Sequence, residues 1–282
     1  MPRKTINKLR RQARRFKEDV SNTMTYVRLT LSGNKISKMT DFDDCKHPVL
    51  MLYGFGATRR TFAILERRLR NDGFCVFSLN LGGIFDTFNT RCIEELAGSV
   101  YDKIESLNRR YRIKKISIIG HSKGGLIGRY YVQKLGGHKR VDTLITLGTP
   151  HHGNPWALLG LFTPLALLSK SIRQMIPISS FMRRLREGSF PRAVKFISIF
   201  SRTDRVCYYK SAILNIPEKY TNLKNIEIPG MSHADFVIRK KAYEIIRQEL
   251  LDEIPSSKTS NKTSKKTRPK QCAAPKRPPK KK

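Results

Sequence analysis

The motif that most constrains this chain is a glycine-x-serine-x-glycine sequence, which runs from Gly120 to Gly124 and centres on Ser122. The mostly β-branched residues 116–119 before it predict a buried strand, and the residues after it predict a helix. A serine on such a sharp turn needs little bulk two residues to either side, which the two glycines supply. This context favours a nucleophile elbow, with Ser122 exposed above a helix N-terminus. The alternative is a glycine-rich turn with a solvent-facing serine.

Strands and helices are predicted to alternate on both sides of this motif. Continuous apolar runs and their flanking turns predict strands at residues 47–53, 74–79, 116–120, 142–147, 193–200 and 224–228. Amphipathic spacing predicts helices at residues 61–71, 93–107, 123–135 and 236–251. This alternation indicates an α/β fold with a mostly parallel central sheet and helices on both faces. A further edge strand is expected at residues 26–31.

Three regions are expected along the chain. Residues 1–28 form a basic N-terminal arm with apolar residues near helical spacing, residues 29–254 form the α/β domain, and residues 255–282 form a disordered basic tail rich in Lys, Pro, Ser and Thr. Residues 154–191 interrupt the domain with an insertion of short apolar helices. This insertion is expected either to pack as an extra layer on the core or to act as a mobile lid over an apolar acyl site.

The charge of the chain is strongly positive and uneven, with a formal net charge of +34. Nine lysines and arginines lie in residues 1–28, and eleven follow Glu253. Such ends favour polyanions, and we expect an anionic membrane surface before nucleic acid. The tail itself is expected to be a solvated extension, and specific binding to a polyanion is its alternative. The oligomeric state is not indicated.

The cysteines and the apolar segments bear on the compartment. Five cysteines are scattered without metal-ligand spacing, which predicts a reducing compartment and no disulfide framework. No apolar segment follows the first basic residues, so no secretory signal is expected, and no stretch reaches the roughly 18 apolar residues of a membrane span. The expected location is the cytoplasm, with peripheral membrane attachment as a further possibility.

A serine hydroxyl is a weak nucleophile, so it needs a base within hydrogen-bond reach and a third group to hold that base. His233 follows the last predicted strand, and Asp204 follows the strand before it. Ser122, Asp204 and His233 are therefore predicted at strand ends on one edge of the sheet, as nucleophile, acid and base. The alternatives are a surface histidine and a turn-forming aspartate.

The other histidines and one aspartate fit supporting roles better. His121 is expected to pack beside the nucleophile, and His151 and His152 are expected to line the pocket or to fix their loop. Asp235 lies only two residues from His233 and is expected to cap the closing helix. None of these four is expected to take part in proton transfer.

Acyl transfer also needs two donors for the developing oxyanion. One is the backbone N–H of Lys123, at the helix N-terminus, and the other is expected from Phe55, in the loop after the first buried strand. That loop contains Gly54-Phe55-Gly56, but Arg59 stands where a dinucleotide-binding loop needs its third glycine. No metal is expected, because the sequence has no H-E-x-x-H motif, no cysteine pair at ligand spacing and no carboxylate cluster.

Four segments together resemble the α/β-hydrolases grouped as bacterial triacylglycerol lipases and related esterases: residues 53–57, 120–125, 146–153 and 201–204. The resemblance covers roughly residues 46–251. It implies hydrolysis of carboxylic esters, often with lipid acyl chains, through a covalent acyl-serine and without a cofactor. The chain order Ser122, Asp204, His233 is the order of these enzymes. One departure is Tyr53, which stands where these lipases usually carry the histidine of a His-Gly pair.

Two other functions are compatible with the same residues. The first is acyl transfer to an acceptor other than water. The second is a binding module that keeps the fold and holds a polyanion, such as nucleic acid, through its basic ends.

Overall fold

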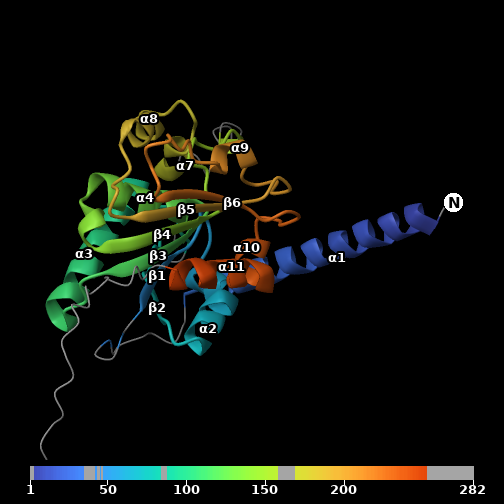
Figure 1. Cartoon of the computed structure of the whole chain (residues 1–282), viewed down its shortest axis with the longest axis horizontal. Coiled ribbons are helices and arrows are strands. Elements are labelled where there is room, and N and C mark those ends of the chain that lie inside the picture. Colours follow the sequence, from blue (N-terminus) through green and yellow to red (C-terminus); the bar gives the residue numbers. More distant parts are fainter. Residues whose placement is uncertain are drawn as a thin grey trace, which may run out of the picture.

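A six-stranded sheet forms the centre of the computed structural model, which describes residues 3–34, 42, 45, 47–83, 88–157 and 169–252 (Figure 1). All neighbouring strands are parallel, and their order is β2-β1-β3-β4-β5-β6. The strands are β1 (Pro48–Leu52), β2 (Cys75–Ser78), β3 (Ile116–His121), β4 (Val141–Leu147), β5 (Lys195–Phe200) and β6 (Leu223–Glu227). The predicted fold class is confirmed.

The central strands are apolar on both faces because helices cover both faces of the sheet. Every residue of β1 and β3 is buried. The parallel registers pair Leu52 with Gly120, and His121 with Leu147. The carboxyl ends of β1, β3 and β4 therefore meet at one edge, where the elbow lies.

The helices of the body follow the predicted pattern with shifted ends. They are α2 (Ala63–Asn71), α3 (Ile93–Tyr111), α4 (Lys123–Lys134), α7 (Lys170–Gln174), α8 (Ser180–Glu187), α9 (Tyr209–Ala212), α10 (Asp235–Ile238) and α11 (Lys240–Leu251). Helices α3 and α4 pack together on one face of the sheet, and α2 lies beside α11 on the other (Figure 1). The short helices α7 and α8 occupy the predicted insertion. Residues 158–168 of that insertion lie outside the described residues, and its role as a lid stays a prediction.

The prediction of one closing helix over residues 236–251 is wrong. The chain breaks at Arg239, whose backbone is extended (φ −73°, ψ 140°), so α10 and α11 are separate. The Arg239 guanidinium forms ion pairs with Asp235 at 3.0 Å and with Asp19 at 3.0 Å. The pair with Asp235 is local, so we attribute the break to the tertiary pair with Asp19, which the local apolar spacing does not reveal.

The edge strand predicted at residues 26–31 is also wrong. These residues end α1 (Arg3–Leu31), a 29-residue helix that crosses the predicted boundary between arm and domain and projects far from the body (Figure 1). The amphipathic repeat of the arm continues through these residues and outweighs their β-branched and aromatic side chains. The Thr58 hydroxyl donates to the carbonyl of Thr30 at 3.0 Å, which fastens the end of α1 to the body.

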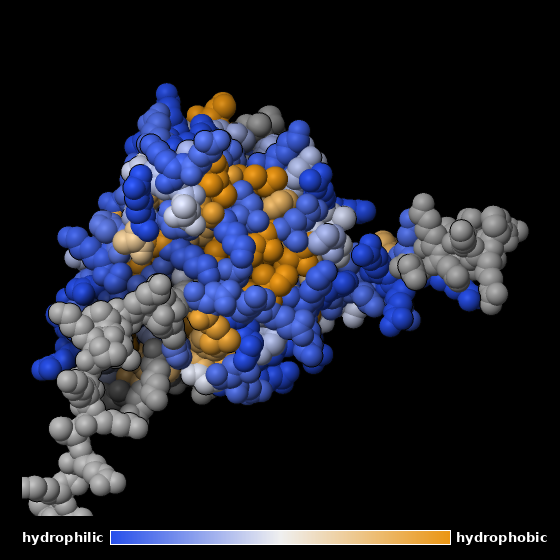
Figure 2. Space-filling model, in the orientation of Figure 1, coloured by the Kyte–Doolittle hydropathy of each residue, from blue (hydrophilic) through white to orange (hydrophobic). Residues whose placement is uncertain are grey.

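Two further features concern the apolar side chains of the molecule. Apolar side chains gather on the viewed face over β6 and α10, close to where α1 leaves the body (Figure 2). Among the described helices, none is both long enough and apolar enough to cross a membrane. The predictions for residues 255–282 concern a segment outside the described residues.

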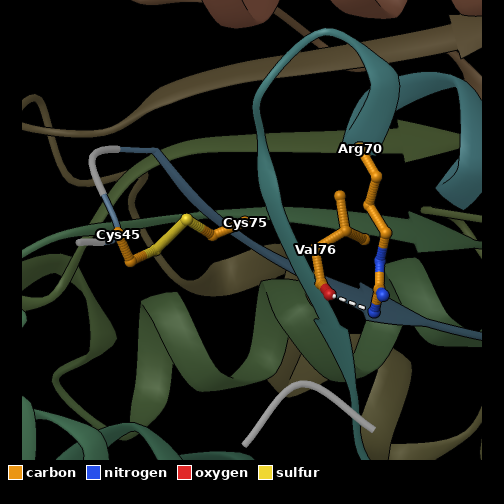
Figure 3. Close-up of a disulfide and its surroundings, with 4 residues drawn as sticks. All are labelled: Cys45, Arg70, Cys75 and Val76. Carbon is orange, nitrogen blue, oxygen red and sulfur yellow. Dashed lines mark hydrogen bonds between the residues drawn. A yellow bond between two sulfur atoms is a disulfide. The ribbon is translucent and has the colours of Figure 1, made fainter. Parts of the chain in front are cut away.

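The sequence predicted no disulfide framework, but one disulfide joins Cys45 and Cys75 (Figure 3). Their Cα atoms lie 5.8 Å apart, since β1 and β2 are neighbours and Cys75 is in register with Pro48. Near this bond, the Arg70 guanidinium donates to the carbonyl of Val76 at 2.8 Å (Figure 3). Spacing in the sequence could not reveal the bond, because it depends on the pairing of two strands.

Candidate active site

The elbow at Ser122 has a backbone conformation that residues other than glycine rarely adopt. Ser122 has φ 54° and ψ −125°, between the end of β3 and the start of α4. A Cβ atom at Gly120 would overlap the backbone of Gly125, and one at Gly124 would overlap the carbonyl of Leu52. The two glycines therefore allow the turn to be this tight, as the motif predicts. Strain of this kind is typical of functional sites.

Neighbouring strand ends hold the elbow in place. The amide of Ser122 donates to the carbonyl of Leu147 at 2.9 Å, and the carbonyl of Ser122 accepts from the Thr149 hydroxyl at 2.9 Å. Thr149 lies in the loop after β4, and it packs directly against Gly125. Sequence reasoning assigned no role to Thr149, although it belongs to one of the motifs that carry the family resemblance.

The structure brings Asp204 and His233 together, as predicted. His233 Nδ1 lies 2.8 Å from Asp204 Oδ2, and Asp204 Oδ1 accepts from the amides of Val206 and Cys207 at 2.8 and 2.9 Å. Burial raises the pKa of Asp204, but the charge of His233 and these hydrogen bonds outweigh it and hold the pKa below its ordinary value. Asp204 is thus an ionised acceptor that orients the imidazole.

Gly148 shows that the elbow and the acid–base pair share one site. It follows Leu147, which holds the amide of Ser122. A Cβ atom at Gly148 would lie 2.9 Å from Asp204 Oδ2 and 3.1 Å from His233 Nδ1. Since Gly148 has φ 52°, only glycine suits both its backbone and its surroundings. The carboxyl ends of β3, β4 and β5 and the loop after β6 therefore converge here.

His121 packs beneath His233, in agreement with its expected place beside the nucleophile. The two rings lie 4.5 Å apart, and His121 Nε2 lies 3.0 Å from the carbonyl oxygen of His233. Burial, followed by the charge of His233, lowers the pKa of His121 to about 3. His121 is thus a neutral imidazole that donates from Nε2 and fixes the backbone of the His233 loop.

The two expected oxyanion donors come from two elements that meet at the elbow. Lys123 is the first residue of α4, where backbone N–H groups lack partners within the helix. Phe55 belongs to the loop after β1, and a Cβ atom at Gly54 in that loop would lie 3.1 Å from the Cβ of Ser122. This loop therefore passes directly beside the serine. The use of both amides for an oxyanion stays a prediction.

The side chain of Lys123 is buried and makes hydrogen bonds that the sequence did not predict. Its ammonium donates to Asn89 Oδ1 at 2.8 Å and to the carbonyl of Arg91. Burial lowers the pKa of Lys123 to about 7. Asn89 Nδ2 in turn donates to the carbonyl of Tyr53 at 2.7 Å, and the amide of Gly56 donates to the carbonyl of Asn89 at 3.1 Å. Asn89 thus links the elbow to the loop that carries Phe55.

The remaining candidates have structural contacts. His151 is buried and lies 2.9 Å from the Thr146 hydroxyl, while His152 Nε2 lies 2.9 Å from the carbonyl of Ile213. Both histidines therefore fix the loop after β4, one of the roles expected for them. Asp235 begins α10 and accepts from the amide of Ser232 at 2.8 Å. Asp235 stabilises the start of that short helix.

The described residues also bear on cofactors. Within them, no group of three or more histidine, cysteine or acidic side chains lies close enough together to hold a metal ion.

Comparisons with known proteins agree with this architecture. A family model described as palmitoyl protein thioesterase matches residues 48–183. A lipase of Aspergillus fumigatus has a similar structure (TM-score 0.62, 18% identity), with 77% of this chain and 55% of the lipase covered. The mature form of a Bacillus licheniformis lipase is also similar (TM-score 0.58, 15% identity), with 77% and 96% covered. A monoacylglycerol lipase of Paleococcus ferrophilus shares 17% identity at a TM-score of 0.53, with 73% and 95% covered.

The chain has the α/β-hydrolase fold. The resemblance to lipases and esterases of this superfamily is therefore confirmed at the level of the fold. In this chain, Tyr53 stands where the resemblance to lipases implies the histidine of a His-Gly pair. The Tyr53 side chain is fully buried, and its hydroxyl accepts from the amide of Leu81 at 2.6 Å. Tyr53 thus anchors the loop after β1 to the segment after β2.

Proposed function

We propose that this α/β-hydrolase cleaves carboxylic esters with lipid-like acyl chains, with Ser122 as nucleophile, His233 as base and Asp204 as the residue that orients it. One observation carries the proposal: the hydrogen-bonded pair of His233 and Asp204 lies beside a strained serine turn, at the edge where Gly148 touches both members of the pair. A scaffold has no physical need for this combination, because the strain costs about 1–3 kcal/mol.

The proposed reaction has two halves. Ser122 Oγ forms a bond to the acyl carbonyl carbon while His233 Nε2 accepts the hydroxyl proton, and the amides of Phe55 and Lys123 stabilise the resulting oxyanion. The bond to the leaving alcohol then breaks, and His233 returns the proton to that alcohol. In the second half, water attacks the acyl-serine in the same way and releases the carboxylic acid.

A thioester is the second candidate substrate, and the match to the palmitoyl protein thioesterase model favours it. The matched residues contain Ser122 and both expected oxyanion donors, but neither Asp204 nor His233. A thioester forms the same acyl-serine, and its thiol leaves more readily than an alcohol because its pKa is about 8.5. Both substrates therefore use the same site, but an alcohol leaving group depends more on a proton from His233 than a thiol does.

Turnover of matched substrates tests the proposal. The wild type and Ser122→Ala are assayed on p-nitrophenyl esters of increasing acyl length and on the corresponding acyl thioesters. We expect kcat of Ser122→Ala to be at least about 10³-fold lower on every substrate that the wild type cleaves. An unchanged rate in Ser122→Ala would contradict the assigned nucleophile.

Product analysis of the same reactions separates the alternatives. Free carboxylic acid as the main product supports hydrolysis, whereas product formed only with an added acceptor would show acyl transfer. A folded protein that turns over neither ester nor thioester, and binds DNA in a salt-dependent way, would favour the binding module.

A further inference from the structure

Helix α1 has one face seated on the body. Asn22 Nδ2 donates to Asp235 Oδ1 at 2.6 Å, and Asp19 pairs with Arg239 at 3.0 Å. Farther along the helix, the half-buried ring of Tyr26 lies edge-on to His121, with 5.8 Å between ring centroids. These contacts fix which side of α1 faces the protein.

The other face of α1 carries a continuous apolar stripe, which we call the outer stripe. Its members are separated by four, four, three and four residues, so they lie on one side of a helix with 3.6 residues per turn. All are exposed: Phe16 67%, Val20 38%, Met24 68%, Val27 48% and Leu31 72%. A single exposed apolar residue is ordinary, but an unbroken row over four turns marks an interaction surface.

Basic side chains border the outer stripe on one side. Arg10, Lys17 and Arg28 are all exposed, and helical spacing places them next to the stripe. The acidic residues Glu18 and Asp19 lie on the face toward the body, where both pair with Arg239. The exposed side of α1 therefore combines an apolar strip with positive charge.

We propose that α1 is a membrane-surface helix, which lies in the plane of an anionic lipid bilayer with the outer stripe among the acyl chains. Arg10, Lys17 and Arg28 then meet the anionic headgroups, as in other amphipathic helices with a basic polar face. Charge disfavours a second copy as the partner, because two such basic borders would face each other and each chain carries +34. The binding surface does not depend on the chemistry proposed for Ser122.

Attachment through α1 holds the active-site edge close to the lipid. Asp235, which anchors Asn22, is two residues from His233, and Tyr26 packs on the residue before Ser122. A substrate with a lipid acyl chain would thus reach the elbow from the surface to which the enzyme is bound. This consequence rests on the proposed function, whereas membrane binding itself does not.

Vesicle sedimentation with the full chain tests the proposal. The background is Ser122→Ala, so that turnover cannot alter the lipid. Vesicles are pure phosphatidylcholine or contain about 30% phosphatidylserine. We expect Phe16→Ser/Met24→Ser/Leu31→Ser to lower the partition coefficient on anionic vesicles by at least about tenfold, and Arg10→Gln/Lys17→Gln/Arg28→Gln to lower it by a similar factor. All six residues are exposed, so the fold is expected to survive, and circular dichroism checks this.

A matched control replaces exposed polar residues of the same helix, Gln12→Ala/Ser21→Ala/Thr23→Ala, and is expected to bind like the parent. Binding of the triple-serine variant equal to that of the parent would overturn the proposal. A lipid-free dimer that the triple-serine variant converts to monomer would also overturn it and would assign the stripe to a second copy. Since the parent lacks Ser122, neither result depends on whether the proposed hydrolysis occurs.

Discussion

Asp204 offers one carboxylate oxygen to His233, at 2.8 Å from Nδ1, while its other oxygen accepts two backbone amides. The carboxylate is therefore fixed in direction before it meets the imidazole. An imidazole whose Nδ1–H is held in this way presents Nε2 as the proton acceptor. The chain order of Ser122, Asp204 and His233 brings the pair to one edge of the sheet. The loop after β5 sets the direction of the Asp204 carboxylate.

Replacement of Asp204 tests this arrangement. Asp204→Asn keeps the shape but removes the charge and allows the wrong imidazole tautomer, so we expect kcat to fall by about 10²–10⁴-fold with little change in KM. Steady-state kinetics on a cleaved ester measures the effect. Asp142→Asn, which removes an exposed carboxylate paired with Lys115, is the control and is expected to keep the parent rate. Equal rates for the two variants would show that Asp204 does not orient the base.

The strain at Ser122 makes a prediction about stability. With φ 54° and ψ −125°, Ser122→Gly relieves a conformation that Ser122→Ala retains, so the glycine variant should be more stable by about 1 kcal/mol. Urea unfolding measures the difference. The same pair of substitutions at Ser99, inside α3, should show the opposite order, because glycine costs about 1 kcal/mol in a helix. The same order at both sites would mean that the elbow is not strained.

The roles of the backbone amide and the side chain of Lys123 can be tested separately. Lys123→Met removes the buried ammonium but keeps the amide that we assign to the oxyanion, so labelling of Ser122 by an active-site probe should persist. The folded chain releases the Lys123 proton at about pH 7, whereas the unfolded chain holds it to about pH 10.5. Unfolding therefore takes up a proton between these values, and the wild type gains stability as pH rises.

Urea unfolding of the wild type and Lys123→Met at several pH values measures this gain. Relative to that of the variant, the unfolding free energy of the wild type should rise by up to about 1.4 kcal/mol per pH unit between roughly pH 7 and 10. A difference that does not change with pH would contradict a lowered pKa of the buried Lys123 side chain. Loss of labelling in a folded variant would show that its side chain, and not only its amide, is needed.

The bond between Cys45 and Cys75 should contribute measurably to stability. It closes a segment of 30 residues, for which loop-closure entropy gives about 3–4 kcal/mol. Addition of dithiothreitol should lower the unfolding free energy of the wild type by this amount. Cys45→Ser/Cys75→Ser should be less stable than the oxidised wild type and insensitive to the reductant. If dithiothreitol does not change the unfolding free energy of the wild type either, the two cysteines are not bonded in solution.

Local patterns were sufficient for the six strands of the sheet and for the placement of the candidate residues Asp204 and His233 at neighbouring strand ends. The apolar runs that became β1 and β3 are buried on both faces, so their sequence alone marks them as central strands. Parallel strands bring their carboxyl ends to one edge, which is why strand order placed Asp204 and His233 together. The glycines around Ser122 likewise report a local constraint.

What the sequence did not reveal depends on contacts between distant residues. Asn22 and Asp235 are 213 residues apart, yet their hydrogen bond helps to seat α1 on the body. The break at Arg239 and the bond between Cys45 and Cys75 are decided in the same way, by partners from other elements. Asn89 lies in a loop without a motif, and only the fold shows that it links the elbow to the loop after β1.

Covalent labelling with a fluorophosphonate probe tests the central claim most directly, because it reports an activated serine without a choice of substrate. We predict rapid labelling of the folded wild type at Ser122, confirmed by peptide mass analysis, and loss of labelling in both Ser122→Ala and His233→Ala. His152→Ala, which removes a histidine of a neighbouring loop, should still be labelled. Labelling of the wild type at another residue, or undiminished labelling of folded His233→Ala, would contradict the assignment of Ser122 and His233 as nucleophile and base.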